Sequence, residues 1–145
     1  MSDESSAASP VEKHIIIKFD GASRGNPGPA GIGVILENSR GEVVGKVVKR
    51  IGVATNNQAE YSALIAGIEA ALRLGAVSLD IRGDSKLIVE QIRGNYKVKE
   101  PKLKSLFQTA CRLLTRCEKY SIKWVPREAN SEADKLIDNL FLTLG

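Results

Sequence analysis

The spacing of apolar residues changes near residue 57, from a pattern typical of strands to one typical of helices. This change limits the chain to folds that combine a sheet with helices. Before it, residues 14–20 (HIIIKFD) form an apolar run typical of a strand that is buried on both faces. Residues 31–38 and 42–51 are typical of two strands joined by a glycine-containing turn. Residues 21–31 contain four glycines and two prolines, so we expect an irregular turn there. The first part of the chain therefore predicts three antiparallel strands.

After this point the apolar positions follow helical spacing until Gly75, which is typical of a helix C-terminal cap. The remaining elements alternate between helix and strand: a strand at 77–83, a helix at 85–94, a helix that opens at Pro101, a strand at 120–126 and a final helix from Ala133. Trp124, in the last of these strands, is expected in the core. Because strands separated by helices pair in parallel, the sheet must be mixed. The expected fold is α/β, with a five-stranded mixed sheet flanked by helices.

The composition is that of a single soluble domain. With 43% hydrophobic residues, the chain is too apolar to be wholly disordered, and no apolar run is long enough to cross a membrane. Two cysteines and one histidine exclude a disulfide scaffold and a Cys/His zinc module. We expect a disordered leader over residues 1–12 and one domain over residues 13–145. Without an export signal, a heptad pattern or an apolar overhang, the expectation is a cytoplasmic monomer that binds no membrane.

Four acidic residues lie at positions that structural roles alone do not explain when the four are taken together. Asp20 ends the first buried strand, Glu60 faces the sheet from its helix, Asp84 follows the fourth strand, and Asp134 lies on the inward margin of the last helix. Ligands of open α/β sheets gather near the carboxyl ends of central strands, so we expect these four acids to meet there. Each alone could cap a helix or bind nearby amides. Together they would repel one another, and a pair of Mg²⁺ or Mn²⁺ ions would remove that conflict.

The segments around these acids resemble the four motifs of type 1 ribonuclease H. The segments are DGASRGNPGPAGIG from Asp20, TNNQAEYSAL around Glu60, GDSKLIVEQI with Asp84, and VPREANSEAD ending at Asp134. The resemblance covers about residues 14–142 in family order. It implies strand order 3-2-1-4-5, with the first three strands antiparallel. It also implies an endonuclease that hydrolyses the RNA strand of RNA/DNA hybrids by two-metal-ion catalysis, leaving 5′-phosphate and 3′-hydroxyl ends, with the four acids as catalytic metal ligands.

Short amide and hydroxyl side chains can exchange hydrogen bonds with a 2′-hydroxyl in the open minor groove of a hybrid. The TNNQ segment at 55–58 offers four such side chains in a row. The resemblance implies that six residues contact the hybrid: Ser23, Asn26, Thr55, Asn56, Asn57 and Gln58. Of these, Thr55 would hold a DNA phosphate. Asn56 could also cap the helix that follows it.

The positive charge of the chain is concentrated in one short segment. Between Arg93 and Lys104 there are five cations and one acid, a local excess equal to the whole net charge of +4. This pattern fits a solvated helix face, or a surface that binds phosphates through Lys97, Lys99 and Lys102. It falls where some ribonucleases H carry a long basic protrusion. The glycines match neither phosphate-loop nor dinucleotide fingerprints, so no nucleotide cofactor is expected.

The chain departs from the family pattern in the loop before its last acid. Many members place a histidine there, whereas this chain has Arg127 and no histidine. The departure affects the expected rate but not the acidic tetrad. Two alternatives therefore remain beside an active ribonuclease H: a non-catalytic nucleic-acid-binding module of the same fold, and a DNA-directed nuclease of the wider superfamily. The 2′-hydroxyl readout expected of TNNQ argues against the second alternative.

Overall fold

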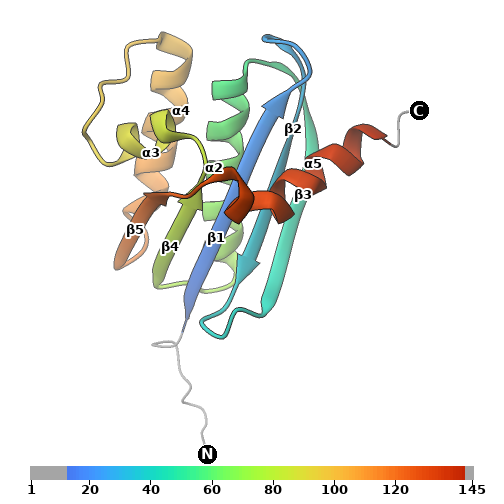
Figure 1. The fold of residues 1–145 in the computed structure, drawn as a ribbon. Helices are drawn as coiled ribbons and strands as arrows, with labels where there is room; N and C mark the ends of the chain where they lie inside the picture. The colour runs from blue at the N-terminus through green and yellow to red at the C-terminus, as the bar shows by residue number, and fades with distance from the viewer. Residues whose placement is uncertain (1–12, 143–145) are drawn as a thin grey trace, which may run out of the picture.

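A computed structural model describes residues 13–142, so the leader predicted over residues 1–12 lies outside the described residues. A twisted five-stranded sheet is covered by helices on both faces (Figure 1). Helix α2 (Asn56–Arg73) packs on one face of the first three strands, and α5 (Ser131–Leu142) crosses the opposite face of the same strands. This arrangement confirms the predicted α/β class.

The sheet has the strand order β3-β2-β1-β4-β5, as predicted. Its strands are β1 His14–Ser23, β2 Gly28–Glu37, β3 Val43–Ala54, β4 Ser78–Gly83 and β5 Lys119–Trp124. The first three strands pair antiparallel, whereas β1 pairs parallel to β4, and β4 parallel to β5. The carboxyl ends of β1, β4 and β5 therefore lie at the same edge of the sheet.

Local sequence accounts for where the helices begin and end. Thr55 caps α2, because its side chain accepts a hydrogen bond from the Gln58 backbone while the Gln58 side chain accepts one from the Thr55 backbone. Asn56 is thus the first helical residue and not the cap that it could have been. The other helical elements are α3 Lys86–Ile92, α4 Pro101–Leu114 and the 3₁₀ turn η2 Arg127–Asn130. Gly75, at a φ of +87°, follows the end of α2 as predicted.

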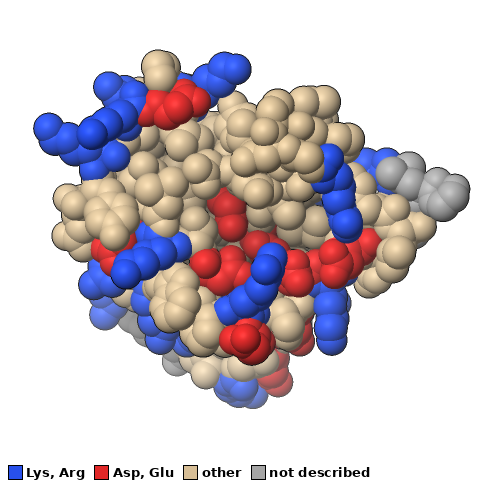
Figure 2. Space-filling view, turned by 45° about the horizontal axis from the view of Figure 1, so that its top comes forward, with Lys and Arg blue, Asp and Glu red and all other residues tan. Residues whose placement is uncertain are grey.

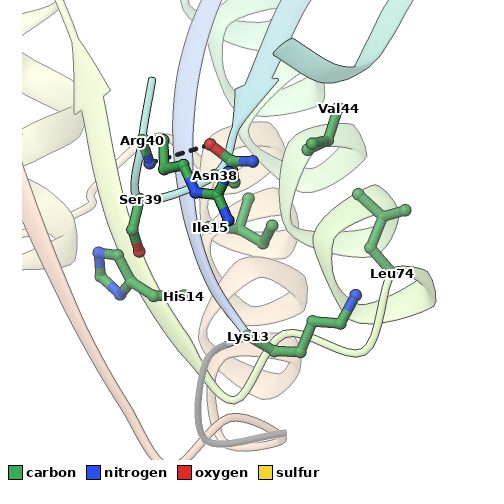
Figure 3. Close-up of a pocket in the computed structure, with 8 residues that line it drawn as sticks. All are labelled: Lys13, His14, Ile15, Asn38, Ser39, Arg40, Val44 and Leu74. Carbon is green, nitrogen blue, oxygen red and sulfur yellow. Dashed lines mark hydrogen bonds between the residues drawn. The ribbon is translucent and has the colours of Figure 1, made fainter. Parts of the chain in front are cut away.

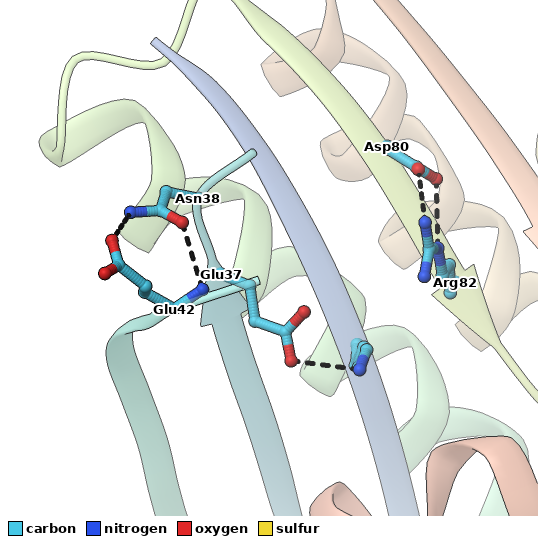
Figure 4. Close-up of polar contacts among 6 residues, drawn as sticks. Glu37, Asn38, Glu42, Asp80 and Arg82 are labelled. Carbon is cyan, nitrogen blue, oxygen red and sulfur yellow. Dashed lines mark hydrogen bonds and ion pairs between the residues drawn. The ribbon is translucent and has the colours of Figure 1, made fainter. Parts of the chain in front are cut away.

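The core lies between the sheet and α2, with α4 packed against α2 on its outer side. Alternate residues of β1, Ile17 and Phe19 among them, are fully buried against this helix layer. The opposite face of the sheet carries charges that are paired with one another. Lys18 Nζ lies 2.9 Å from Glu37 Oε2, and Arg82 binds Asp80 at 2.8 Å (Figure 4). Asp20 shares the side of β1 that carries Lys18, so it faces away from the apolar core.

Two predictions about local structure were wrong. The segment 21–31 is not an irregular turn throughout, because β1 continues to Ser23 and β2 starts at Gly28. Gly21 serves close packing, since a Cβ there would lie 2.1 Å from the carbonyl oxygen of Ala59 in α2. Trp124 was expected in the core but is 49% exposed. It ends β5, which pairs with β4 alone among the strands of residues 13–142 and so lies at an edge of the sheet.

Within residues 13–142, no helix combines the length and the hydropathy that crossing a membrane requires.

Candidate active site

Three of the four predicted acids meet at one edge of the sheet. Asp20, Glu60 and Asp84 each offer a carboxylate oxygen, and these oxygens all lie within 4.8 Å of one another. The parallel register of β1 and β4 explains why Asp20 and Asp84 lie together. Phe19 pairs with Gly83, and each of these residues is followed by one of the two acids. The three carboxylates form an oxygen-only donor set, which suits Mg²⁺ or Mn²⁺.

Glu60 reaches this edge because α2 lies directly against β1. The missing side chain of Gly21 lets the two backbones approach, and the Gly21 N–H donates a hydrogen bond to Glu60 Oε1 at 3.2 Å. Glu60 therefore comes from the helix side of the sheet and Asp20 from the other side.

Asp134 approaches Asp20 from α5. Its helix packs closely on β2, since a Cβ at Gly33 would lie 2.4 Å from the carbonyl oxygen of Ala133. The Asp134 carboxyl contacts that of Asp20, although it does not belong to the three-oxygen group. Asp20 is thus common to both contacts: it belongs to the three-oxygen group with Glu60 and Asp84, and it contacts Asp134.

Asn130 holds this last element in place, and sequence reasoning missed it. The residue is 1% exposed, and its Nδ2 donates a hydrogen bond of 2.8 Å to the carbonyl oxygen of Phe19, the neighbour of Asp20. The bond ties η2 and the start of α5 to β1 beside the acids. An asparagine four residues before Asp134, inside the fourth motif, was the only signal available in the sequence.

The electrostatics of the cluster favour a bound cation. Burial, then the charge of Asp84 and the contact with Asp134, raise the pKa of Asp20 to about 8. Burial, followed by the charges of Asp20 and Asp84, raises the pKa of Glu60 well above its usual value. Burial also raises the pKa of Asp84. The positive charge of Arg127 opposes all three increases. Divalent cations would stabilise the ionised carboxylates more strongly than one arginine does.

The predicted hybrid-binding residues near the acids fall into two groups. Ser23, Asn26 and Asn56 bind one another: Asn56 Oδ1 accepts from the Ser23 backbone at 2.8 Å, and Asn26 Oδ1 accepts from the Asn56 backbone at 3.0 Å. These contacts join the loop after β1 to the start of α2. Within residues 13–142, the Asn57 side chain makes no such hydrogen bond, and it is half-buried. Its amide is therefore available to a ligand.

The predicted basic segment spans the connection between α3 and α4 and the first turn of α4, which carries Lys102. Lys97, Lys99 and Lys102 are all exposed there. In the view of Figure 2, acidic side chains gather in the middle of the face, and a group of lysines and arginines lies at one side of it. Gln91 links this connection to α2. Its buried side chain accepts a hydrogen bond from Tyr61 at 2.6 Å and donates one to the Lys97 carbonyl.

The acids do not line the cavity shown in Figure 3. That cavity, of about 480 Å³, lies at the other end of β1 and β2. It is lined by Lys13, His14, Ile15, Asn38, Ser39, Arg40, Val44 and Leu74. The candidate active site is therefore separate from this cavity and lies at the opposite end of β1.

Comparison with known proteins gives concordant matches. A family model described as reverse transcriptase-like matches residues 18–139. Ribonuclease HI of Halobacterium salinarum is 48% identical over 118 residues, which are 81% of this chain and 59% of the relative. Ribonuclease H of Syntrophus aciditrophicus is 33% identical, with 92% of this chain and 82% of the relative covered. The chain spans between 35% and 59% of the length of the first curated relatives that it matches.

Solved structures share the fold over most of the chain. The crystal structure of LC11-RNase H1 in complex with an RNA/DNA hybrid superposes with a TM-score of 0.82 at 41% identity. The match covers 86% of this chain and 94% of that one.

Proposed function

Since the chain belongs to the ribonuclease H family, we propose that it hydrolyses the RNA strand of RNA/DNA hybrids by two-metal-ion catalysis. The cuts would leave 5′-phosphate and 3′-hydroxyl ends. The single observation that carries this proposal is the meeting of Asp20, Glu60, Asp84 and Asp134 at the carboxyl edge of the sheet. The relatives and the hybrid complex of a similar structure support the choice of substrate.

The donor set fits a pair of Mg²⁺ or Mn²⁺ ions. Asp20, Glu60 and Asp84 would hold one ion, and Asp20 and Asp134 would hold the second. Bound there, the ions supply positive charge that activates water and stabilises the attacking and leaving oxygens of a phosphodiester. The protein contributes fixed positions: the register of β1 and β4 aligns two acids, Gly21 orients Glu60, and Asn130 fixes the approach of α5.

Recognition of the RNA strand would fall to the loop after β1 and the start of α2. Asn57 would exchange hydrogen bonds with 2′-hydroxyls, because its amide is not engaged within the described chain. The loop after β1 and the start of α2 would present polar groups to the minor groove of the hybrid. These groups belong to Ser23, Asn26 and Asn56, with Thr55 and Gln58 beside them. Lys97, Lys99 and Lys102 would bind phosphates of the duplex without sequence preference.

One assay separates this proposal from its two alternatives. The protein is incubated with labelled RNA/DNA hybrid, duplex DNA and duplex RNA of one sequence, with Mg²⁺, with Mn²⁺ and with EDTA. We expect cleavage of the hybrid alone, only with metal, and a 3′-hydroxyl that a polymerase can extend. Binding of the hybrid without cleavage would favour the non-catalytic module, and cleavage of duplex DNA would favour the DNA-directed nuclease.

The role of the acids is tested by Asp20→Asn in the same assay. The substitution keeps the size of the side chain and removes its charge, so metal binding and cleavage should both be lost. Hybrid cleavage at the wild-type rate by this variant would refute the assignment of Asp20.

A further inference from the structure

Trp124 lies directly beside one of the catalytic acids. It ends β5 and pairs in register with Gly83, the last residue of β4. Its indole Nε1 donates a hydrogen bond to the carbonyl oxygen of Asp84 at 3.2 Å. A second bond of 2.9 Å, from the Val125 N–H to the Gly83 carbonyl, continues the pairing past the indole. The ring is thus attached to the backbone that carries the Asp84 carboxylate.

Trp124 as a residue is 49% exposed. Leaving half of an indole in water forgoes free energy that its burial would yield. The hydrogen bond to Asp84 fixes the orientation of the ring, so its apolar surface is held in one position before any ligand arrives. A fixed, exposed aromatic surface loses little conformational entropy when it is covered, which favours contact with a ligand.

From this position we propose that Trp124 is a substrate-contact residue, whose ring packs against the sugars of the hybrid backbone beside the scissile bond. The inference rests on the proposed function, because it assumes that the hybrid occupies the carboxylate edge. Bases inside a duplex are paired and stacked, whereas the sugars present C–H groups at the surface. An apolar ring next to Asp84 therefore meets sugars first.

The chain offers a direct reporter of this contact, because Trp124 is its sole tryptophan. Fluorescence, excited where tyrosine does not absorb, is recorded while hybrid is added in EDTA, so that no cleavage occurs. We expect the emission to shift to shorter wavelength as the hybrid covers the ring. A separate titration of the free protein with Mg²⁺ and without hybrid shows how far metal alone changes the emission.

Kinetics of matched variants supply the second measurement. Trp124→Leu keeps apolar bulk but loses the ring, and its KM for hybrid should rise about five- to tenfold, which corresponds to roughly 50 Å² of lost apolar contact. Its kcat should stay within about twofold of the wild-type value. Trp124→Phe keeps a ring, so its KM should rise less. The control is Tyr120→Leu, since Tyr120 is an exposed aromatic residue on the same strand, four residues from the site. This control should leave KM unchanged.

Each outcome decides the proposal. An emission shift with the hybrid, together with a raised KM in Trp124→Leu but not in Tyr120→Leu, supports it. An unchanged KM, or a loss confined to kcat, overturns it, because the ring would then act only on the position of Asp84. Unchanged emission at saturating hybrid also overturns it. If Trp124→Leu does not fold, Trp124→Phe and the emission of the wild-type protein decide. Failure of the wild-type protein to cleave hybrid contradicts the proposed function instead, and the titration in EDTA still tests the contact.

Discussion

The Gly21 N–H binds Glu60 Oε1 at 3.2 Å, so one residue of β1 both follows Asp20 and orients the acid that α2 contributes. The same glycine sets the separation of the two elements, because a Cβ there would lie 2.1 Å from the carbonyl oxygen of Ala59. The distance between Asp20 and Glu60 therefore depends on the absence of one side chain.

Gly21→Ala should separate β1 from α2 and displace Glu60. We expect the free energy of unfolding to fall by about 2–3 kcal/mol, as for other overpacked sites, and hybrid cleavage to fall by about 100-fold. Urea denaturation and cleavage rates measure the two effects. Gly45→Ala in β3 is the control, because the nearest atoms to its Cβ would be side-chain carbons, of Leu36 at 3.3 Å and of Leu74 at 3.9 Å. Equal rates for the two variants would show that this spacing is not needed.

The metal-free protein should lose stability as the pH rises. The pKa of Asp20 is raised to about 8 by burial and by neighbouring acids, whereas in the unfolded chain it lies near 4, roughly. The folded protein therefore binds more protons than the unfolded chain, and its free energy of unfolding falls between about pH 4 and pH 8. Melting temperatures in EDTA across this range measure the effect.

Asp20→Asn removes this titration and provides the matching variant. At about pH 8 in EDTA it should melt at least about 5 °C above the wild-type protein, and the difference should shrink toward pH 4. Mg²⁺ should raise the melting temperature of the wild-type protein more than that of the variant. A wild-type melting temperature that rises steadily with pH in EDTA would contradict the assigned electrostatics.

Replacing Lys97, Lys99 and Lys102 with glutamine should weaken hybrid binding. The plot of log affinity against log salt concentration has a negative slope, and each lost phosphate contact makes this slope shallower by about 0.9. The slope is measured in EDTA over a range of salt concentrations. A variant of equal charge, with glutamine at Lys13, Arg40 and Lys46 away from the acids, serves as the control. An identical slope in the two variants would remove the basic segment from the interface.

Asn57 and Asn56 should behave differently when each is replaced by alanine. Asn57→Ala should reduce the preference for hybrid over duplex DNA, by about tenfold for a lost recognition contact of 1–2 kcal/mol, and leave the melting temperature unchanged. Asn56→Ala breaks hydrogen bonds from Ser23, so it should also lower the melting temperature. Comparative binding and thermal melts separate the two effects. A destabilised Asn57→Ala with normal discrimination would refute the distinction.

Arg127→Gln should shift the pH dependence of cleavage. The guanidinium lowers the pKa of Asp20, Glu60 and Asp84, so its removal raises these values. Protons then compete with metal up to a higher pH, and the acid limb of kcat/KM should move upward. Arg127→Lys keeps the charge and should retain the wild-type limb. Coincident profiles for all three proteins would show that this cation has no influence on the acids.

Local signals in the sequence predicted the mixed sheet and the positions of the acids, whereas the strand order was predicted from the resemblance to ribonuclease H. Apolar periodicity separates strands from helices, and the order of elements leaves few ways to arrange a mixed sheet. Asp20 and Asp84 could be located from strand ends alone, since parallel neighbours end at one edge. The motifs placed Glu60 and Asp134 beside them, and the structure brings all four acids together.

The remaining features depend on contacts between distant segments. Gly21 resembles a turn residue, yet it lies in a strand, and a glycine is required there because the backbone of Ala59 in α2 leaves no room for a side chain. Trp124 has the apolar character of a core residue. Its exposure follows from the position of β5 at the edge of the sheet, which local sequence does not show. The burial of Asn130 follows from its bond to Phe19, 111 positions away in the chain. Local pattern carries no information about these partners.

The placement of the acids on β1, on α2, after β4 and on α5 has a consequence for synthesis of the protein. A growing chain on the ribosome holds the first three long before α5 emerges, and it cannot complete the cluster until its final helix folds. Under the proposed function, cleavage therefore requires α5 as well as the three earlier acids, and a polypeptide that stops before α5 carries only three of the four.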